Sequence, residues 1–149
     1  MGTDGRPRIG EVSPTEAWAV LRDNPRAVLI DVRTSAEWGF VGKPDLEELG
    51  KTLLCVEWAT FPGMSTYPHF AEAVMTELGS EAPDTFLFIC RSGVRSLRAA
   101  TAFAELLADR GMQGACFNVA EGFEGDLDDT GHRGVLGGWK ARGLAWRQS

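Results

Sequence analysis

Phe86-Leu-Phe-Ile-Cys-Arg-Ser-Gly-Val-Arg-Ser96 is the stretch from which both the fold and the site are inferred. Its first four apolar residues predict a buried strand that ends at Cys90. A short loop of small and polar residues follows, and the next residues have the apolar spacing of a helix. A thiol between a strand end and a helix start lies where backbone N–H groups and the helix dipole favour negative charge. The stretch therefore predicts a cysteine nucleophile in its thiolate form.

The loop after Cys90 has the residue types of an anion site. Glycine permits a positive φ, so successive N–H groups can turn inward and form an anion-binding nest. Two arginines add forked cationic donors that suit tetrahedral oxyanions such as thiosulfate, sulfate or phosphate. Each arginine could instead be solvated or paired with an acidic neighbour. The candidate site consists of Cys90 as the nucleophile and of substrate-binding residues Arg91, Ser92, Gly93, Val94, Arg95 and Ser96.

The rest of the chain alternates strand-like and helix-like segments. Ser13-Pro-Thr-Glu16 is a capping box that begins a helix ending near Asp23. Further helices are expected at 70–78 and 92–110, the latter with Leu97 and later apolar residues towards the core. Strands are expected at 27–31, 53–56, 86–89 and 116–119, an irregular connection at 39–50 and an exposed loop at 60–68. This alternation predicts a parallel sheet with helices on both faces, whose sites lie at the carboxyl ends of the strands.

Composition narrows the class of protein. The chain has 149 residues, 44% of them hydrophobic, and a net charge of −6, so we expect one domain over residues 1–149. The negative charge argues against nucleic acid or an anionic membrane as a partner. No segment resembles a signal peptide or a membrane span, and the cytoplasm is the expected location. Two distant histidines and no C-x-x-C arrangement give no metal site, and Cys55 and Cys116 are expected to be buried strand residues.

Three segments in the chain carry a resemblance to one known family. They are Leu29-Ile-Asp-Val-Arg33 with Glu37-Trp38, the Cys90 loop, and Asn118-Val-Ala-Glu-Gly-Phe123. In this order they resemble the signatures of the rhodanese-like sulfurtransferases. The resemblance implies a sheet of five parallel strands flanked by helices. It also implies structural roles for Asp31, Arg33 and Glu37.

The resemblance implies a sulfur-transfer mechanism without a cofactor. The Cys90 thiolate would attack a small anionic donor such as thiosulfate, and an acceptor thiol, an acceptor protein or cyanide would remove the sulfur from the resulting persulfide. Backbone N–H groups of residues 91–96 would surround the persulfide, and Arg91 or Arg95 would orient the donor. The chain departs from the family at Phe40-Val-Gly-Lys-Pro44 and in an acidic, glycine-rich insertion at 124–138, which is expected to shape access to the pocket.

Two alternatives stay open. Some cysteine phosphatases share this fold, but their C-x5-R loop places an arginine on the phosphate oxygens. Here four residues separate Cys90 from Arg95, and Ser96 stands in the place of the phosphatase arginine, which favours sulfur transfer. The second alternative is a non-catalytic module that binds a protein partner. The intact Cys90 argues against it, because degenerate modules commonly lack the nucleophile.

Overall fold

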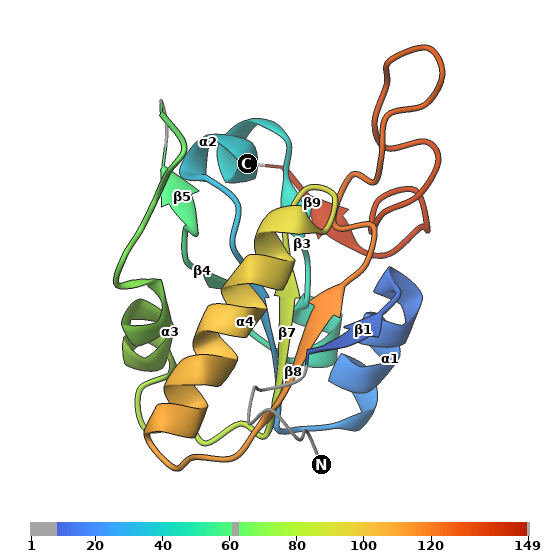
Figure 1. The fold of residues 1–149 in the computed structure, drawn as a ribbon. Coiled ribbons are helices and arrows are strands. Elements are labelled where there is room, and N and C mark those ends of the chain that lie inside the picture. Colours follow the sequence, from blue (N-terminus) through green and yellow to red (C-terminus); the bar gives the residue numbers. More distant parts are fainter. Residues whose placement is uncertain (1–8, 61–62, 149) are drawn as a thin grey trace.

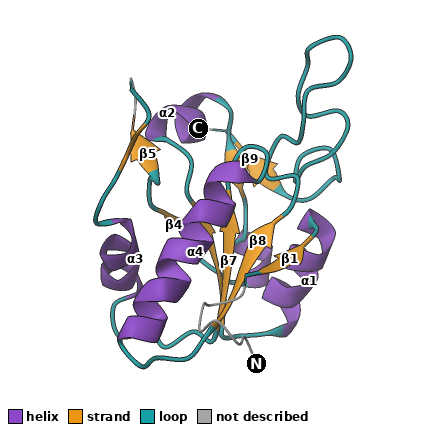
Figure 2. Ribbon diagram, viewed as in Figure 1, coloured by secondary structure: helices purple, strands orange, loops and turns teal. Residues whose placement is uncertain are grey.

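The computed structural model describes residues 9–60 and 63–148, and a parallel sheet of five strands forms its centre. The strands lie in the order β1-β8-β7-β2-β4, and helices cover both faces (Figure 1, Figure 2). This arrangement confirms the predicted α/β fold with a five-stranded parallel sheet. The strands of this sheet are β1 Gly10–Val12, β2 Ala27–Asp31, β4 Leu54–Cys55, β7 Thr85–Ile89 and β8 Ala115–Val119. The helices are α1 Pro14–Asp23, α2 Ser35–Phe40, α3 Phe70–Leu78, α4 Val94–Asp109 and the short 3-10 helix Glu47–Leu49.

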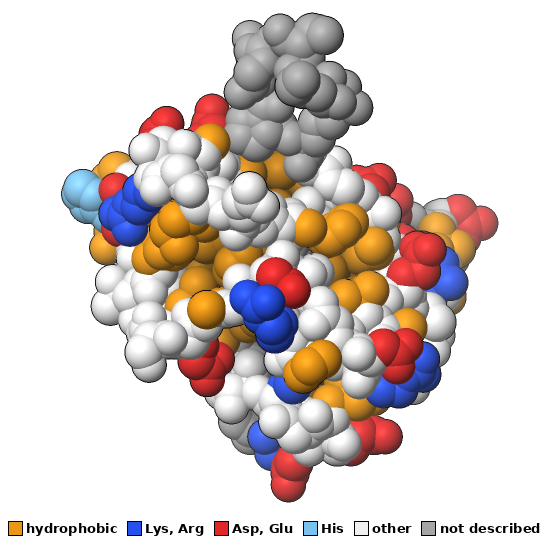
Figure 3. Space-filling view, turned by 90° about the horizontal axis from the view of Figure 1, so that it is seen from below, with side chains coloured by type: hydrophobic (Ala, Val, Ile, Leu, Met, Phe, Trp, Pro, Cys, Tyr) orange, Lys and Arg blue, Asp and Glu red, His pale blue; other side chains and the backbone are white. Residues whose placement is uncertain are grey.

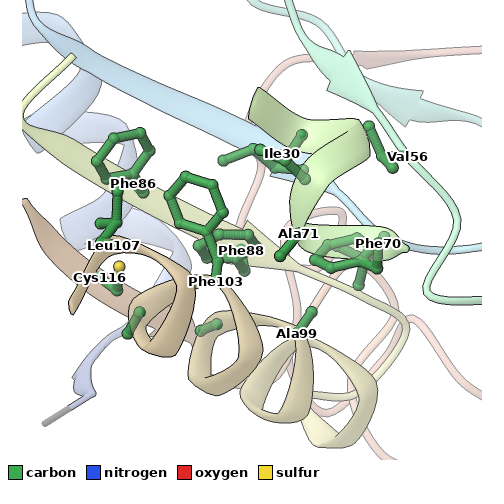
Figure 4. Packing of buried hydrophobic residues seen from close by; sticks show 14 of the residues in the cluster. Ile30, Val56, Phe70, Ala71, Phe86, Phe88, Ala99, Phe103, Leu107 and Cys116 are labelled. Atoms are coloured by element: carbon green, nitrogen blue, oxygen red, sulfur yellow. The ribbon is translucent and has the colours of Figure 1, made fainter. Parts of the chain in front are cut away.

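The central strand β7 divides its side chains between two hydrophobic cores. Phe86 and Phe88 pack with α3 and α4, whereas Leu87 and Ile89 pack with α1 on the other face. Figure 4 shows the first core, in which the Phe103 ring lies 4.8 Å from the Phe86 ring and 5.7 Å from the Phe88 ring, between centroids. Burial on both faces explains why this strand is a continuous apolar run rather than an alternating one.

Helix α4 begins later than the sequence pattern suggested. The prediction placed its start at residue 92, but Gly93 has a φ of 110° and precedes the first helical residue. Leu97 was expected to face the core and is 44% exposed. The buried stripe of the helix passes through Ser96, Ala100 and Phe103, and at 100° per residue Leu97 lies at its margin.

The edges of the sheet were the hardest parts to predict. Strand β1 was absent from the prediction because three residues are too short for a period to be read. It pairs with β8, and this register places Glu11 opposite Asn118. At the other edge, only two residues of the expected strand 53–56 pair with β2.

Two small antiparallel pairs correct the expected irregular segments. The segment expected as an exposed loop at 60–68 is exposed as predicted at residue 60 and at 63–68, and residues 61–62 lie outside the described part. It is not irregular throughout, because β5 (Ala59–Thr60) and β6 (Ser65–Thr66) form a hairpin. Within the expected irregular connection, β3 (Lys43–Pro44) pairs with β9 (Trp146–Arg147) near the end of the chain. Both pairs involve two-residue strands, so periodicity in the sequence carries no signal for them.

The segment after β8 has no helix or regular strand until β9, but its far end is anchored. The Trp139 side chain is fully buried, and its ring lies 5.9 Å from the Trp18 ring of α1. Its indole N–H donates a hydrogen bond of 2.7 Å to the Ala145 carbonyl. The insertion at 124–138 lies between β8 and this anchor, and its loops project from the molecule on the side of the strands' carboxyl ends (Figure 1).

The opposite end of the molecule, where the strands begin, has a mixed surface. Acidic, basic and hydrophobic side chains alternate across it (Figure 3). Within residues 9–60 and 63–148, no helix is long and apolar enough to cross a membrane. The same residues contain no cluster of three or more His, Cys, Asp or Glu side chains placed to hold a metal ion.

Candidate active site

Cys90 lies directly after the central strand β7 and before the loop that leads into α4. The carboxyl ends of β2 and β8 flank it, because these strands pair with β7 on either side. The Cys90 residue is 1% exposed. The protein rather than bulk water therefore supplies the hydrogen-bond partners of the sulfur.

Two groups of the loop hold the Cys90 sulfur. The Gly93 N–H donates to Sγ with an N to S distance of 3.1 Å, and the Ser96 Oγ lies 3.2 Å from Sγ. The φ of 110° at Gly93 directs this N–H inward, and residues other than glycine rarely adopt such a φ. The Gly93 N–H is the fixed donor to this sulfur, and together with the amino end of α4 it can stabilise negative charge that develops there during a reaction.

Asn118, on β8, connects this loop to the rest of the sheet. Its Oδ1 lies 2.5 Å from the Ser96 Oγ, and its Nδ2 donates to the Gly93 carbonyl at 3.1 Å. The same Nδ2 also donates to Glu11 Oε2 at 3.1 Å. Asn118 is 3% exposed, so both groups that hold the sulfur are themselves held by one buried amide.

The turn after β8 fixes the backbone of the loop from the other side. The Phe123 N–H donates to the Cys90 carbonyl at 2.8 Å, and the Glu124 N–H donates to the Arg91 carbonyl at 3.0 Å. Gly122 makes this approach possible, because a Cβ there would lie 2.5 Å from the Cys90 carbonyl oxygen. These bonds fix the backbone of Cys90 and Arg91 at the start of the loop whose Gly93 N–H donates to the sulfur.

Arg95 does not extend into solvent. Its Nη1 lies 2.7 Å from Glu37 Oε1 and its Nη2 lies 2.8 Å from Oε2, and the two side chains are 18% and 14% exposed. Glu37 is also the third residue of α2, where it accepts the Thr34 backbone N–H in a capping box. Burial by itself would raise the pKa of Glu37, but the hydrogen bonds from Arg95 and Thr34 outweigh it and lower this pKa to about 2.

The two other signature residues form a second, separate pair. Arg33 and Asp31 are fully buried, with Arg33 Nη2 2.7 Å from Asp31 Oδ2. The Arg33 guanidinium also donates to the Gly42 carbonyl and lies over the Phe123 ring, 4.3 Å from its centroid. These contacts join the end of β2 to the turn after β8, which agrees with the structural role that the resemblance implied.

The remaining predicted site residues differ in exposure. Arg91 and Val94 are exposed, Ser92 is half-buried and Ser96 is fully buried. Arg91 and Arg95 line a cavity of about 390 Å³ beside the loop, together with Glu37, Val41, Met64, Glu124 and Arg133. The candidate site therefore consists of a buried sulfur held by the loop and an adjoining cavity rich in arginine.

The other two cysteines have no such surroundings. Burial raises the pKa of Cys116 to about 12. Burial and then the charge of Asp31 raise the pKa of Cys55 to about 11. Cys116 is buried as predicted, whereas Cys55 is only half-buried. Neither thiol is set up to react as a thiolate near neutral pH.

Several known proteins match this chain over nearly its whole length. The uncharacterized protein RP600 of Rickettsia prowazekii is 30% identical over 139 residues, which cover 93% of this chain and 98% of RP600. The crystal structure of Rv0390 from M. tuberculosis is 47% identical, with a TM-score of 0.79, and the match covers 96% of this chain and 100% of Rv0390. The chain belongs to the family of RP600. No protein-family model matches the sequence.

More distant solved structures show the fold of this RP600 relative. The polysulfide-sulfur transferase homodimer from Wolinella succinogenes is 20% identical, with a TM-score of 0.54 over 98% of this chain and 83% of that one. The As-Sb reductase from Leishmania major is 19% identical, with a TM-score of 0.58 over 90% of this chain and 76% of that one. RPA3614 from Rhodopseudomonas palustris, described as a possible tyrosine phosphatase, is 18% identical, with a TM-score of 0.52 over 93% and 85%. The fold is therefore rhodanese-like, and at these identities the likeness concerns the fold alone.

Sequence reasoning missed several residues of the site in this RP600 relative. It placed Asn118 at a strand end but gave it no role, and it did not foresee that Glu37 would pair with Arg95. The ends of β7 and β8 lie side by side in a parallel sheet, so that rule could have pointed to Asn118. The insertion at 124–138 was expected at the entrance to the pocket, and its residues Glu124 and Arg133 do line the cavity beside the loop, but the sequence did not single out Arg133.

Proposed function

We propose that this chain is a sulfurtransferase that carries sulfane sulfur on Cys90. The Cys90 thiolate attacks the outer sulfur of a donor such as thiosulfate. The S–S bond of the donor breaks, sulfite leaves with the electron pair, and Cys90 becomes a persulfide. The thiolate of an acceptor, or cyanide, then attacks the outer sulfur of this persulfide, and Cys90 leaves as a thiolate. Neither step uses a metal or another cofactor.

The identity of the residue six positions after Cys90 is the main support for this proposal. In a C-x5-R phosphatase loop that position holds an arginine, whereas here it holds Ser96, whose Oγ lies 3.2 Å from the sulfur. Arg95, one position earlier, is paired with Glu37. A phosphoryl group needs a guanidinium on its oxygens, but a persulfide needs only donors close to sulfur. The geometry thus favours sulfur transfer over phosphoryl transfer.

A donor anion would meet a guanidinium at the cavity mouth. Arg91 is exposed there and forms no ion pair with any described residue. We therefore assign the orientation of the donor to Arg91, with Arg95 available only if its pair with Glu37 opens.

The three unpaired cysteines suit a reducing compartment, and the cytoplasm is part of the proposal.

Thiosulfate treatment followed by intact-mass spectrometry tests the proposal. The wild-type protein should gain the mass of one sulfur atom, and peptide mapping should place it on Cys90. Cys90→Ser should gain none, and the matched control Cys116→Ser should gain as much as wild type.

Two outcomes would replace the proposal. If several sulfane donors leave Cys90 unmodified while the protein hydrolyses an aryl phosphate, the phosphatase alternative is correct. If the protein shows neither reaction, the alternative of a non-catalytic module that binds a protein partner takes its place.

A further inference from the structure

The cavity beside the Cys90 loop is lined by four separate parts of the chain: α2 with the residue after it, the β5–β6 hairpin, the Cys90 loop and the insertion at 124–138. Its volume is about 390 Å³, and its charged lining comes from α2, the Cys90 loop and the insertion at 124–138. This volume lies in the range of small-molecule sites and exceeds what one tetrahedral oxyanion needs. The cavity therefore has room for a reactant larger than thiosulfate.

The charges of this cavity do not all cancel. Arg95 and Glu37 neutralise each other within the wall. Arg91, Arg133 and Glu124 remain, and none of them forms an ion pair with a described residue. Two guanidinium groups and one carboxylate thus face the same space without charged partners.

Two charged residues of the insertion, Glu124 and Arg133, line the cavity near the base of the insertion. The Arg133 Nη1 donates to the Gly125 carbonyl at 2.8 Å, which leaves its other N–H groups available. The Gly134 N–H donates to the Glu124 carbonyl at 2.6 Å, so the outgoing and returning chains are tied beside these side chains. Arg133 and Glu124 are both half-buried rather than extended into solvent. The Arg133 guanidinium is therefore held in place before anything binds, which lowers the ordering cost of binding.

We propose that this cavity binds the sulfur acceptor, and that the acceptor is a thiol carrying both a carboxylate and an ammonium group, as an α-amino-acid thiol does. Its carboxylate would bind Arg91 and Arg133, since guanidinium groups recognise carboxylates through paired N–H donors. Its ammonium would bind Glu124. The inference rests on the proposed function, because it concerns the step that discharges the Cys90 persulfide.

The chemistry of this step balances without an oxidant or a reductant. The acceptor thiolate attacks the outer sulfur of the Cys90 persulfide, and a new S–S bond forms on the acceptor. The S–S bond to Cys90 breaks, and Cys90 takes the electron pair as a thiolate. The acceptor leaves as a persulfide anion with the same net charge as the thiolate that attacked.

Three small thiols test the carboxylate contact and the ammonium contact of the acceptor separately. L-Cysteine carries both charged groups, cysteamine lacks the carboxylate, and 3-mercaptopropionate lacks the ammonium. The protein is loaded with thiosulfate, desalted, and its discharge is followed by intact mass with each thiol, at equal thiolate concentration. Loss of one charge-assisted contact should lower the discharge rate about tenfold or more.

In Arg133→Ala the ratio of the cysteine rate to the cysteamine rate should fall about tenfold relative to wild type. In Glu124→Gln the ratio of cysteine to 3-mercaptopropionate should fall by a similar factor. Arg133→Lys should recover part of the first ratio. Arg98→Ala, which removes an exposed arginine of α4 outside the cavity, is the matched control and should keep both ratios. Because each ratio is measured within one variant, a general loss of folded protein cancels.

The outcomes distinguish this inference from the function on which it rests. If Cys90 takes no sulfur from thiosulfate, the proposed function fails at the loading step, and the inference falls with it. If Cys90 loads normally but both ratios stay at their wild-type values in Arg133→Ala and Glu124→Gln, only the inference is wrong. Equal, slow discharge by all three thiols would also overturn it, because the acceptor would then not be of this class.

Discussion

Arg95 and Glu37 form an ion pair with two hydrogen bonds, 2.7 and 2.8 Å long, between residues 58 positions apart in the chain. The pair joins the first turn of α4, beside Cys90, to the capping box of α2. It thereby fixes one wall of the cavity at the candidate site.

The first prediction concerns the stability that this pair provides. Arg95→Ala should lower the free energy of unfolding by about 1–3 kcal/mol, because it leaves a mostly buried carboxylate without its partner. Urea unfolding of both single variants and of the double variant with Glu37→Gln measures the coupling. Additive losses in this cycle would mean that the pair contributes nothing beyond its separate side chains. Arg22→Ala is a suitable control, since its pair with Asp23 is exposed and should matter little.

The second prediction is a pH dependence of stability due to Glu37. Its pKa is about 2 in the folded chain and 4.5 as the ordinary value, so it is lowered on folding. A lowered pKa gives stability that is present above 4.5 and is lost as the pH falls towards 2. Between about pH 5 and about pH 2, the wild type should therefore lose stability faster than Glu37→Gln. Parallel curves for the two proteins in urea unfolding would contradict this.

The third prediction assigns Asn118 a positioning role. Asn118→Ala removes the contacts to Ser96 and to the Gly93 carbonyl, so Cys90 should load sulfur more slowly. We expect a loss of stability of about 1–3 kcal/mol as well, from unsatisfied buried groups. Asn24→Ala is the matched control, because Asn24 bonds Asp84 and Thr85 at the far end of the strands. If both variants load at the wild-type rate, Asn118 has only a structural role.

The fourth prediction concerns the backbone at Gly93. Gly93→Ala must keep a φ near 110° or lose the N–H bond to sulfur, and a non-glycine residue in this region costs about 1–2 kcal/mol. Gly111→Ala is matched to it, since Gly111 has a φ of 65° but lies beyond the far end of α4 in open space. Both variants should be less stable, yet only Gly93→Ala should load sulfur slowly. Equal rates of sulfur loading in both variants would show that the backbone at Gly93 has no role in the reaction of Cys90.

Much of the fold follows from local features of the sequence. The capping box of Ser13 and Glu16 is formed as predicted, and β2 spans the predicted residues. These elements depend on hydrogen bonds and apolar spacing within a few residues, which the sequence displays directly. The same holds for the position of Cys90, because an apolar run followed by a glycine-containing loop is a local pattern.

Only the tertiary structure decided which groups meet around Cys90. The sequence alone indicated the nucleophile, its loop and the parallel sheet. It did not show that Arg95 would pair with Glu37, that Asn118 would hold Ser96, or that Arg133 would be the arginine that the insertion places at the cavity. These contacts join segments tens of residues apart, and their partners are set by the order of strands in the sheet and by packing across its edge. Local propensities carry no information on such pairings, so the nucleophile was apparent from the chain while its surroundings were not.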